Sequence, residues 1–501
     1  MKGRPAAATP LVLALDIGTS STRAMVFDRD GQALDGLEVQ TPYRLMTTAD
    51  GGVEGDPEEL ARVAEEVIDG VLERAGDLAG EIRAVGVSCF WHSLLGLDGD
   101  GEPLTPVYSW ADTRSAAAAD KLRDEVDEDL LHDRTGCVFH TSYWPAKLRW
   151  LAATQLDTVR RVAHWGGYAE YLALRLTGTL ACSVSMASGT GLLDQHTADW
   201  YRPLIERLDL DPDRLPPLVD RDDGRARLRP EYAKRWPALK DVPWYPAVGD
   251  GACNNVGSGC VTPARMALSI GTSGVMRVVV PAEEVIIPRR LWCYRIDHRR
   301  YVLGGALSNA GNVADWLRAT TRLPDDAAQQ VAALAPDSHG LTILPFLAGE
   351  RTPEWRPRAR AAFVGLALDT TPLEILRAGL EAVACRFALV HELLRPLAGQ
   401  EYQIVCSGGG VAHWPVWPQI IADALGVPLV EAKQLEASAR GAAVLALDAL
   451  GVYEDLADAP APLGRTYTPD ADAHAAYRAE RGRLEWLNAV LAPQFDGGSE
   501  K

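Results

Sequence analysis

Residues 13–19 read Leu-Ala-Leu-Asp-Ile-Gly-Thr, and residues 266–272 read Met-Ala-Leu-Ser-Ile-Gly-Thr. Each copy is followed by a serine and then by an apolar run. The equivalent residues Asp16 and Ser269 are 269 − 16 = 253 positions apart, which is about half of the 501-residue chain. An apolar strand, a tight Gly-Thr-Ser turn and a second strand that recur at half-length indicate a duplicated domain.

The sequence around the first copy predicts a mixed α/β domain. The runs 11–18, 22–28 and 32–39 are apolar or alternating and are separated by turns, which predicts two successive hairpins. Asp56 then supplies the N-cap of an amphipathic helix that begins at Pro57. We expect the apolar run that follows this helix, IRAVGVSC, to be a buried strand.

The second half repeats this order. Residues 266–274, 291–297 and 301–307 are predicted to form the same three-strand opening, and helical patterns and further strands follow. Three antiparallel strands, a helix and then parallel strands, twice over, describe two mixed α/β domains that face one another across a cleft. We expect ligands to bind in that cleft.

Composition and charge narrow the class of protein. With 47% hydrophobic and 24% charged residues, the chain has the composition of a soluble globular protein. Its 50 Lys and Arg residues against 68 Asp and Glu residues give a net charge of −18, which disfavours nucleic acid and anionic membranes as partners. The eight cysteines include no C-x-x-C pair. We therefore expect reduced thiols and a cytoplasmic location, with no membrane partner.

The two Gly-Thr-Ser turns are predicted to bind phosphate. A glycine at the tip lets backbone N–H groups converge, and the neighbouring side chains add hydroxyl donors and one cation, which suits a polyphosphate. The candidate contacts, all in or beside the two turns, are Gly18, Thr19, Ser20, Arg23, Gly271 and Thr272. An ordinary hairpin turn is the alternative for either copy alone, and the repetition favours the phosphate site. The chain contains neither a P-loop nor a Rossmann fingerprint.

Two carboxylates are candidates for metal binding or catalysis beside that polyphosphate. Asp16 ends the first strand of the first copy, whereas the second copy has Ser269 at that position. We expect Asp16 to hold Mg²⁺, directly or through water. Asp250 lies between Gly249 and Gly251 at the junction of the halves, at the start of an expected helix. A plain N-cap aspartate is the alternative for Asp250.

These motifs resemble the FGGY family of carbohydrate kinases over nearly the whole chain. The matching segments are DIGTSSTR at 16–23, WADTR at 110–114, GDG at 249–251, SIGTSG at 269–274, AAFVGL at 361–366 and SGGGVAHWPVWPQIIAD at 407–423. The segments most similar to gluconokinases are FWHSLLGLD at 90–98, WADTRS at 110–115, ASGTGLLD at 187–194 and GERTPEW at 349–355. Trp91 departs from the pattern, since gluconokinases and xylulokinases usually have Met there. Gly379 also departs from it, at a position that we expect to affect packing.

The resemblance implies an α/β fold with two actin-like (ribonuclease H-like) domains that arose by internal duplication and face one another across a cleft. Residues 9–253 would bind the sugar and carry the first phosphate hairpin. Residues 254–501 would bind the nucleotide and end in a C-terminal helix and a short tail. Asp250 would be the general base that takes the proton of the attacking hydroxyl, and it would also contact the substrate and the metal. Asp16 would hold Mg²⁺ through water, so ATP and Mg²⁺ are the expected cofactors.

The candidates for sugar binding follow the strand that ends near residue 90. Trp91 would cover a C–H face of the sugar, and His92 and Asp112 would read its hydroxyl groups. Arg114, with Lys147, would meet a carboxylate of the substrate. A structural ion pair between Asp112 and Arg114 is the alternative.

The nucleotide candidates lie in the second half. Gly409 and Gly410 belong to a run of three glycines between a strand and a helix, where the backbone can approach a base and a ribose. Asn312 is expected to line the same cleft.

The expected function is ATP-dependent phosphorylation of a sugar or sugar-acid hydroxyl, with gluconate as the preferred substrate. A pentulose kinase of the xylulokinase type is the alternative. An actin-like ATPase without a sugar substrate is more remote, because the chain after Val452 leaves room for one helix and a tail but not for a further domain. The sequence does not determine the oligomeric state, and a homodimer is compatible with it.

Overall fold

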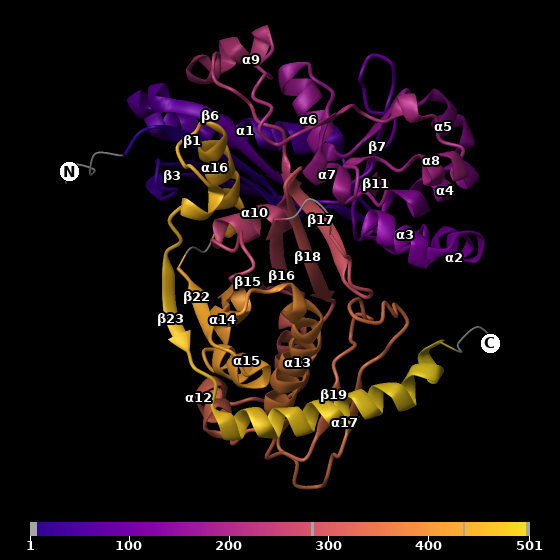
Figure 1. Ribbon diagram of the computed structural model, residues 1–501, viewed down its shortest axis with the longest axis vertical. Helices are drawn as coiled ribbons and strands as arrows, with labels where there is room; N and C mark the ends of the chain where they lie inside the picture. Colours follow the sequence, from indigo (N-terminus) through magenta and orange to yellow (C-terminus); the bar gives the residue numbers. More distant parts are fainter. Residues whose placement is uncertain (1–7, 282–284, 434–435, 497–501) are drawn as a thin grey trace. The chain divides into compact units, whose positions relative to one another are not determined.

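The computed structural model describes residues 8–281, 285–433 and 436–496 (Figure 1). The chain folds into two compact units, and each unit is built from three segments of the sequence. The first unit comprises residues 1–261, 280–302 and 436–461, and the second comprises residues 262–279, 303–435 and 462–501. Residue 253, after which the sequence predicts the second domain, lies within helix α10 (Asp250–Gly257) of the first unit.

A five-stranded sheet forms the centre of the first unit, with the strand order β14-β6-β1-β2-β3. The strands are β1 (Leu11–Ile17), β2 (Ser21–Phe27), β3 (Ala33–Pro42), β6 (Ile82–Cys89) and β14 (Val248–Gly249). Strands β1, β2 and β3 pair antiparallel, and β6 runs parallel to both β1 and β14. The two predicted hairpins and the buried strand at 82–89 are therefore confirmed. The apolar side chains of β1 are all buried, as is typical of a central strand.

Helix α1 (Pro57–Ala75) packs against β2 and β3. Its start is as predicted, because the Asp56 side chain accepts hydrogen bonds from the backbone N–H groups of Glu58 and Glu59. The predicted apolar face, which includes Leu60 and Val67, is buried.

Helix α16 (Ala437–Ala449) comes from near the end of the chain and lies against β1 and β6 (Figure 1). It also crosses α10 at very short range. A Cβ atom on Gly257 would overlap the carbonyl group of Ala437, and one on Gly441 would overlap that of Cys253. The two glycines thus allow the close backbone contact that joins residues 436–461 to the first unit.

The remaining elements of the first unit are short strands and helices inserted between those of the sheet. The strands are β4 (Met46–Thr47), β5 (Val53–Gly55), β7 (Leu95–Leu97), β8 (Val107–Tyr108), β9 (His164–Gly166), β10 (Cys182–Ser183), β11 (Leu193–Asp194), β12 (Asp199–Trp200) and β13 (Leu218–Val219). The helices are α2 (Ala116–Glu125), α3 (Glu128–Thr135), α4 (Trp144–Thr154), α5 (Leu156–Arg161), α6 (Tyr168–Thr177), α7 (Val184–Ser188), α8 (Arg202–Arg207) and α9 (Pro230–Arg235).

A seven-stranded sheet has the order β17-β18-β16-β15-β21-β22-β23. Its strands are β15 (Arg265–Ile270), β16 (Gly274–Pro281), β17 (Trp292–Asp297), β18 (Arg300–Leu307), β21 (Gln403–Ser407), β22 (Leu429–Ala432) and β23 (Leu463–Tyr467). Strand β15 pairs antiparallel with β16 and parallel with β21, as β1 does with β2 and β6. The order β22-β21-β15-β16-β18 repeats the order β14-β6-β1-β2-β3, which is the predicted duplication.

One detail of the second half differs from the sequence prediction. The predicted opening counts 266–274, 291–297 and 301–307, but the structure has a fourth strand, β16, between the first two of these in the chain, and β18, not β17, lies beside β16. The segment 291–297 reads like a third strand because it is apolar throughout, and periodicity alone does not give its place in the sheet. The division between the units falls within β16 and β18, so β17 is counted with the first unit.

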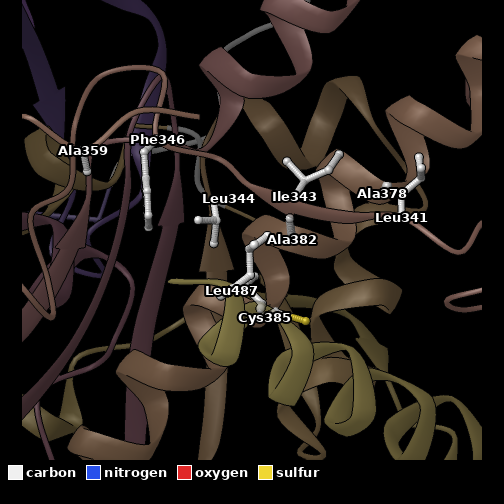
Figure 2. Packing of buried hydrophobic residues seen from close by; sticks show 10 residues of the cluster. Leu341, Ile343, Leu344, Phe346, Ala359, Ala378, Ala382, Cys385 and Leu487 are labelled. Atoms are coloured by element: carbon white, nitrogen blue, oxygen red, sulfur yellow. The ribbon is translucent and has the colours of Figure 1, made fainter. Parts of the chain in front are cut away.

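The helices of the second unit include α11 (Gly311–Thr320), α13 (Pro372–Leu394) and α17 (Ala471–Asp496). Figure 2 shows the core where α13, α17 and β19 (Thr342–Leu344) meet, with Ala382 and Cys385 beside Leu487. The predicted C-terminal helix is therefore packed onto this unit. Gly379 of α13 lies against Leu317 of α11, where a larger residue would collide, so this departure from the family pattern concerns packing.

Four further elements complete the second unit: α12 (Ala327–Ala333), α14 (Gly409–His413), α15 (Trp417–Leu425) and β20 (Ala362–Val364). The eight cysteines of the chain are buried and form no disulfide, as predicted. Among the residues that the structure describes, no helix combines the length and apolar character needed to cross a membrane.

Candidate active site

The carboxyl ends of three parallel strands bring the predicted catalytic residues of the first unit to one edge of its sheet. In the sheet register, Asp16 of β1 and Val248 of β14 both lie beside Ser88 of β6. Asp250 begins the helix that follows β14. Trp91 and His92 follow β6, which lies between β14 and β1 in the sheet. Two strand spacings separate β1 from β14, which is about 10 Å. The edge thus gathers two carboxylates around an aromatic pair.

The two carboxylates share one electrostatic environment. Burial raises the pKa of the Asp16 carboxyl, and the Ser88 hydroxyl and the charge of Arg23 act against that rise. Burial also raises the pKa of the Cys89 and Cys253 thiols, and the charges of Asp16 and Asp250 contribute to the rise in both. A cation at this edge would offset the cost of keeping the Asp16 carboxylate ionised.

Asp250 is not the N-cap of α10, so the alternative left open by the sequence does not hold. The N-cap residue is Gly249, and Asp250 is the first residue of the helix. Its Oδ1 accepts a hydrogen bond of 2.8 Å from the N–H of Gly251, and its carbonyl oxygen accepts one of 3.3 Å from the Ser438 hydroxyl. Both bonds hold Asp250 at the edge of the sheet.

Trp91 forms a wall of this edge. Its side chain is buried, and its Nε1 donates a hydrogen bond of 2.9 Å to the carbonyl oxygen of Ser185. The indole covers both Gly189 and Gly249, and a Cβ atom on Gly249 would overlap the ring. The tryptophan that departs from the family pattern is thus packed directly against the residue that precedes Asp250.

His92 has an unusual backbone conformation, with a φ angle of 69°. A non-glycine residue in this left-handed region is strained and persists where the surrounding structure holds it. The ring Nδ1 is hydrogen-bonded to the carbonyl oxygen of Gly189. This contact and the neighbouring rings of Trp91, Tyr143 and Tyr294 fix the direction of the His92 side chain.

Asp112 and Arg114 form the ion pair that the sequence offered as the alternative. The Arg114 guanidinium bonds both carboxyl oxygens of Asp112 and also the carboxylate of Glu54. Although burial lowers it, the pKa of Arg114 is raised overall by these two carboxylates. The guanidinium lies 4.7 Å from the ring centroid of Trp150, so it is held in place. Asp112 also accepts a hydrogen bond of 3.2 Å from the N–H of Val53.

Lys147, which the sequence places with Arg114, is buried. Its Nζ donates hydrogen bonds to the carbonyl oxygens of Thr141, at 2.7 Å, and Ser142, at 2.5 Å. Burial lowers the pKa of Lys147 to about 7, and the charge of Asp112 acts in the opposite direction.

The first hairpin turn is closed by a hydrogen bond of 3.0 Å from the N–H of Gly18 to the carbonyl oxygen of Ser21. The hydroxyl of Tyr43, the residue after β3, donates to the carbonyl oxygen of Gly18 and supports the turn. Arg23, a predicted phosphate contact, forms ion pairs with Glu38 and Glu436. Tyr43 and Glu436 were missed by the sequence analysis, since nothing local connects either residue to the turn.

The second hairpin is one residue shorter than the first. Four residues separate the last paired positions Ile17 and Thr22, but three separate Ile270 and Gly274. The second turn is held against the start of α11, because the N–H of Gly311 donates to the carbonyl oxygen of Gly271 and that of Asn312 to the carbonyl oxygen of Thr272. These bonds join the predicted nucleotide residues Gly271, Thr272 and Asn312 in one cluster.

The run of three glycines lies beside that cluster. Strands β15 and β21 are parallel, with Ser269 opposite Ser407, so the turn after β21 follows the same edge of the sheet. Gly408 has a φ angle of 102°, and a Cβ atom there would collide with the carbonyl oxygen of Ile270. Glycine is therefore required for Gly409 and Gly410 to lie this close to the end of β15.

Two tyrosines near His92 were also missed by the sequence analysis. The ring centroids of Tyr143 and Tyr294 lie 5.1 Å and 5.5 Å from that of His92. Tyr294 belongs to β17, whose pattern predicts only a strand of the second half. No signal in the sequence connects it with His92, about 200 positions earlier.

A duplicated sheet, a Gly-Thr-Ser turn in each copy and two carboxylates at one strand edge are the features expected of a nucleotide-dependent phosphotransferase. Models of the FGGY family of carbohydrate kinases match the chain over residues 11–257 for the N-terminal domain and 266–450 for the C-terminal domain. The chain therefore belongs to the FGGY family, and its fold is the two-domain α/β, actin-like fold of these kinases.

The individual relatives do not determine which sugar this chain phosphorylates. The chain is 28% identical over 502 residues to the gluconokinase of Bacillus subtilis, with 97% of each chain covered. The structure of gluconate kinase from Lactobacillus acidophilus is similar with a TM-score of 0.89 and 28% identity, covering 98% of this chain and 99% of that one. The structure of xylulose kinase from the same organism is similar with a TM-score of 0.90 and 28% identity, covering 98% and 100%.

The edge that carries Asp16 and Asp250 has the donor chemistry that Mg²⁺ takes in kinases. Mg²⁺ commonly binds one or two protein carboxylates and completes its shell with water and substrate phosphates. In the described part of the chain, no cluster of three or more His, Cys, Asp or Glu side chains forms a metal cage. Two carboxylates at a strand edge therefore fit a magnesium ion that arrives with the nucleotide.

We expect the change Asp16→Ser, which installs the residue of the second copy, to weaken the response to Mg²⁺. The Mg²⁺ concentration for half-maximal turnover should rise about tenfold, as for a lost contact to a charged group. The KM for the sugar should change much less. A magnesium titration of turnover at saturating ATP measures the first value. A collapse of sugar affinity with an unchanged magnesium titration would contradict the metal role.

Proposed function

We propose that this FGGY kinase phosphorylates gluconate with ATP. Support for a kinase comes from the family and from the edge of the first sheet, where Asp16 in β1 and Asp250 directly after β14 lie on either side of the strand that leads to Trp91 and His92. Support for gluconate comes from the similarity to gluconokinases over nearly the full chain. The placement of Asp250 beside the predicted sugar residues is the single observation that carries the proposal.

In the proposed reaction, Asp250 accepts the proton of the acceptor hydroxyl. The hydroxyl oxygen attacks the γ-phosphorus of ATP, the bond to the oxygen that bridges the β-phosphate breaks, and ADP leaves. Mg²⁺ held by Asp16, and by Asp250, would neutralise charge on the phosphoryl group when it is bound with ATP. Trp91 covers an apolar face of the sugar, and His92 bonds a hydroxyl group of it.

The proposed phosphate contacts come from backbone N–H groups and hydroxyl groups of both hairpins. They are Gly18, Thr19, Ser20, Arg23, Gly271 and Thr272. The base and ribose would approach Gly409 and Gly410, with Asn312 at the start of α11. Because Arg23 is paired with Glu38 and Glu436, a phosphate that binds it must compete with two carboxylates. We also propose a cytoplasmic location, which eight free, buried thiols support.

A second candidate is a pentulose kinase, and the state of Arg114 favours it. A gluconate carboxylate entering a chain of net charge −18 requires a local cation. Asp112 and Glu54 already neutralise the guanidinium of Arg114. Neutral D-xylulose requires no such cation. The similarity to a xylulose kinase structure supports the same candidate.

A panel of sugars tests the proposal. With purified enzyme at saturating ATP and Mg²⁺, we expect kcat/KM for gluconate to exceed that for D-xylulose and for glycerol by at least about tenfold. The variant Glu54→Gln removes one of the two carboxylates on Arg114. It should therefore lower KM for gluconate about threefold, as for one partly exposed charge, without changing KM for D-xylulose.

Each other result points to a different function. A preference for D-xylulose, with no effect of Glu54→Gln on either sugar, would replace gluconate by a pentulose. ATP hydrolysis that no sugar stimulates, with no phosphorylated product, would favour the actin-like ATPase.

A further inference from the structure

Strand β17 is tied to the part of the first unit that carries the sugar residues. The N–H of Cys293 donates a hydrogen bond of 3.0 Å to the carbonyl oxygen of Gly136, and Gln195 Nε2 donates one of 3.1 Å to the carbonyl oxygen of Cys293. The N–H of Arg295 donates one of 2.9 Å to the hydroxyl oxygen of Ser188. The residue between Cys293 and Arg295 is thereby fixed on both sides.

The short helix α7 and the glycine after it connect this strand with the catalytic edge. Ser188 receives the bond from β17, and its neighbour Gly189 is bonded to the ring of His92. One turn earlier, the carbonyl oxygen of Ser185 accepts from Trp91, and the Ser185 hydroxyl oxygen accepts a bond of 3.2 Å from the N–H of Gly249. A displacement of β17 would therefore act on His92, Trp91 and the start of α10 through the same helix.

Tyr294 makes the direct side-chain contact between β17 and that edge. Its ring is buried and packs against Trp91, with 4.8 Å between the ring centroids, and against His92. Its hydroxyl is 2.7 Å from the Tyr143 hydroxyl, and the ring of Tyr143 meets His92 edge-on from its own side. Trp292 stacks on Tyr294, with 4.4 Å between ring centroids and an angle of 14° between the rings.

We infer that Tyr294 is a positioning residue for sugar binding, which acts by holding His92 and Trp91 through its ring and its bond to Tyr143. The strained backbone of His92, with its φ angle of 69°, persists only where the surroundings fix it. Because the Tyr294 ring packs against both residues, it acts through them. The inference rests on the proposed function, in which Trp91 and His92 contact the sugar.

The variant Tyr294→Phe tests this inference, since it keeps the ring and removes the bond between the hydroxyl groups. We expect KM for the sugar to rise about fivefold, which corresponds to one neutral hydrogen bond, while kcat and KM for ATP change less than twofold. Tyr294→Leu, which also removes the ring, should raise KM for the sugar further. Sugar binding without ATP, followed by tryptophan fluorescence, should weaken in the same order.

The matched control is Tyr477→Phe in α17. Tyr477 is equally buried, and its hydroxyl donates a hydrogen bond of 2.9 Å to Glu381 and accepts one of 2.8 Å from Arg377, neither of which belongs to the contacts that hold β17. This variant should lower Tm without raising KM for the sugar. If Tyr294→Phe changes Tm and kinetics as Tyr477→Phe does, Tyr294 has only a structural role.

The sugar used is the one that the wild-type enzyme phosphorylates best in the panel. Failure of the gluconate proposal would change that sugar but not the comparison of Tyr294→Phe with Tyr477→Phe. If no sugar in the panel were phosphorylated, the fluorescence titration with the same sugars would still compare the variants. Equal binding by wild type and Tyr294→Leu would overturn the inference.

Discussion

The change Asp250→Asn is expected to lower kcat by roughly two to four orders of magnitude, with little change in KM for ATP. Asparagine keeps the size and the hydrogen-bonding oxygen of the side chain, so the bond from the N–H of Gly251 can remain. It loses the basic carboxylate that would take the proton of the sugar hydroxyl. Steady-state kinetics with sugar and ATP varied separately measure the effect.

Asp127→Asn is the matched control for this prediction. Asp127 is the N-cap of α3, and its carboxylate accepts hydrogen bonds from the N–H groups of Asp129 and Leu130. Changing it should cost at most about 1 kcal/mol of stability and leave kcat unchanged, because asparagine is itself a good N-cap. If Asp250→Asn behaved in the same way and kept most of its kcat, Asp250 would be a helix-start residue without a role in proton transfer.

The parts of the fold that follow from local patterns could be predicted from the sequence. The apolar run at 11–18 is long enough for a buried strand, and the repeat at 266–272 shows where its counterpart lies. Asp56 and Pro57 mark the start of α1 because capping is a property of adjacent residues. Asp16 and Asp250 could be chosen because each stands at the end of a predicted strand or the start of a predicted helix.

The parts that depend on contacts between distant residues could not be predicted. The position of β17 beside β18, and of α16 on β1 and β6, depends on which surfaces are complementary in three dimensions. The ion pair of Arg114 with Asp112 could be foreseen as an alternative, since two positions separate them. Its second partner, Glu54, lies 60 positions away and leaves no local signal. Tyr294 could not be predicted either, because its contact with His92 joins residues that are far apart in the sequence.

The change Gly249→Ala is expected to lower kcat/KM for the sugar about a hundredfold. Gly249 has a φ angle of −59°, which alanine adopts without strain, so the backbone is not the obstacle. The obstacle is the buried indole of Trp91, which occupies the space of the added methyl group. Either the ring or the start of α10 must move, and a shift of about 1 Å at Asp250 is enough to cost this factor. Kinetics and thermal unfolding measure both consequences.

A double-mutant cycle that combines Gly249→Ala with Trp91→Met identifies the cause. The flexible side chain of methionine can make room for the methyl group that Gly249→Ala adds. The double variant should therefore regain at least about tenfold of the lost kcat/KM, so the two changes would not add. Gly80→Ala is the control, because a Cβ atom there meets no neighbouring atom and should leave kinetics unchanged. Additive losses in the cycle would show that Trp91 does not confine Asp250 through Gly249.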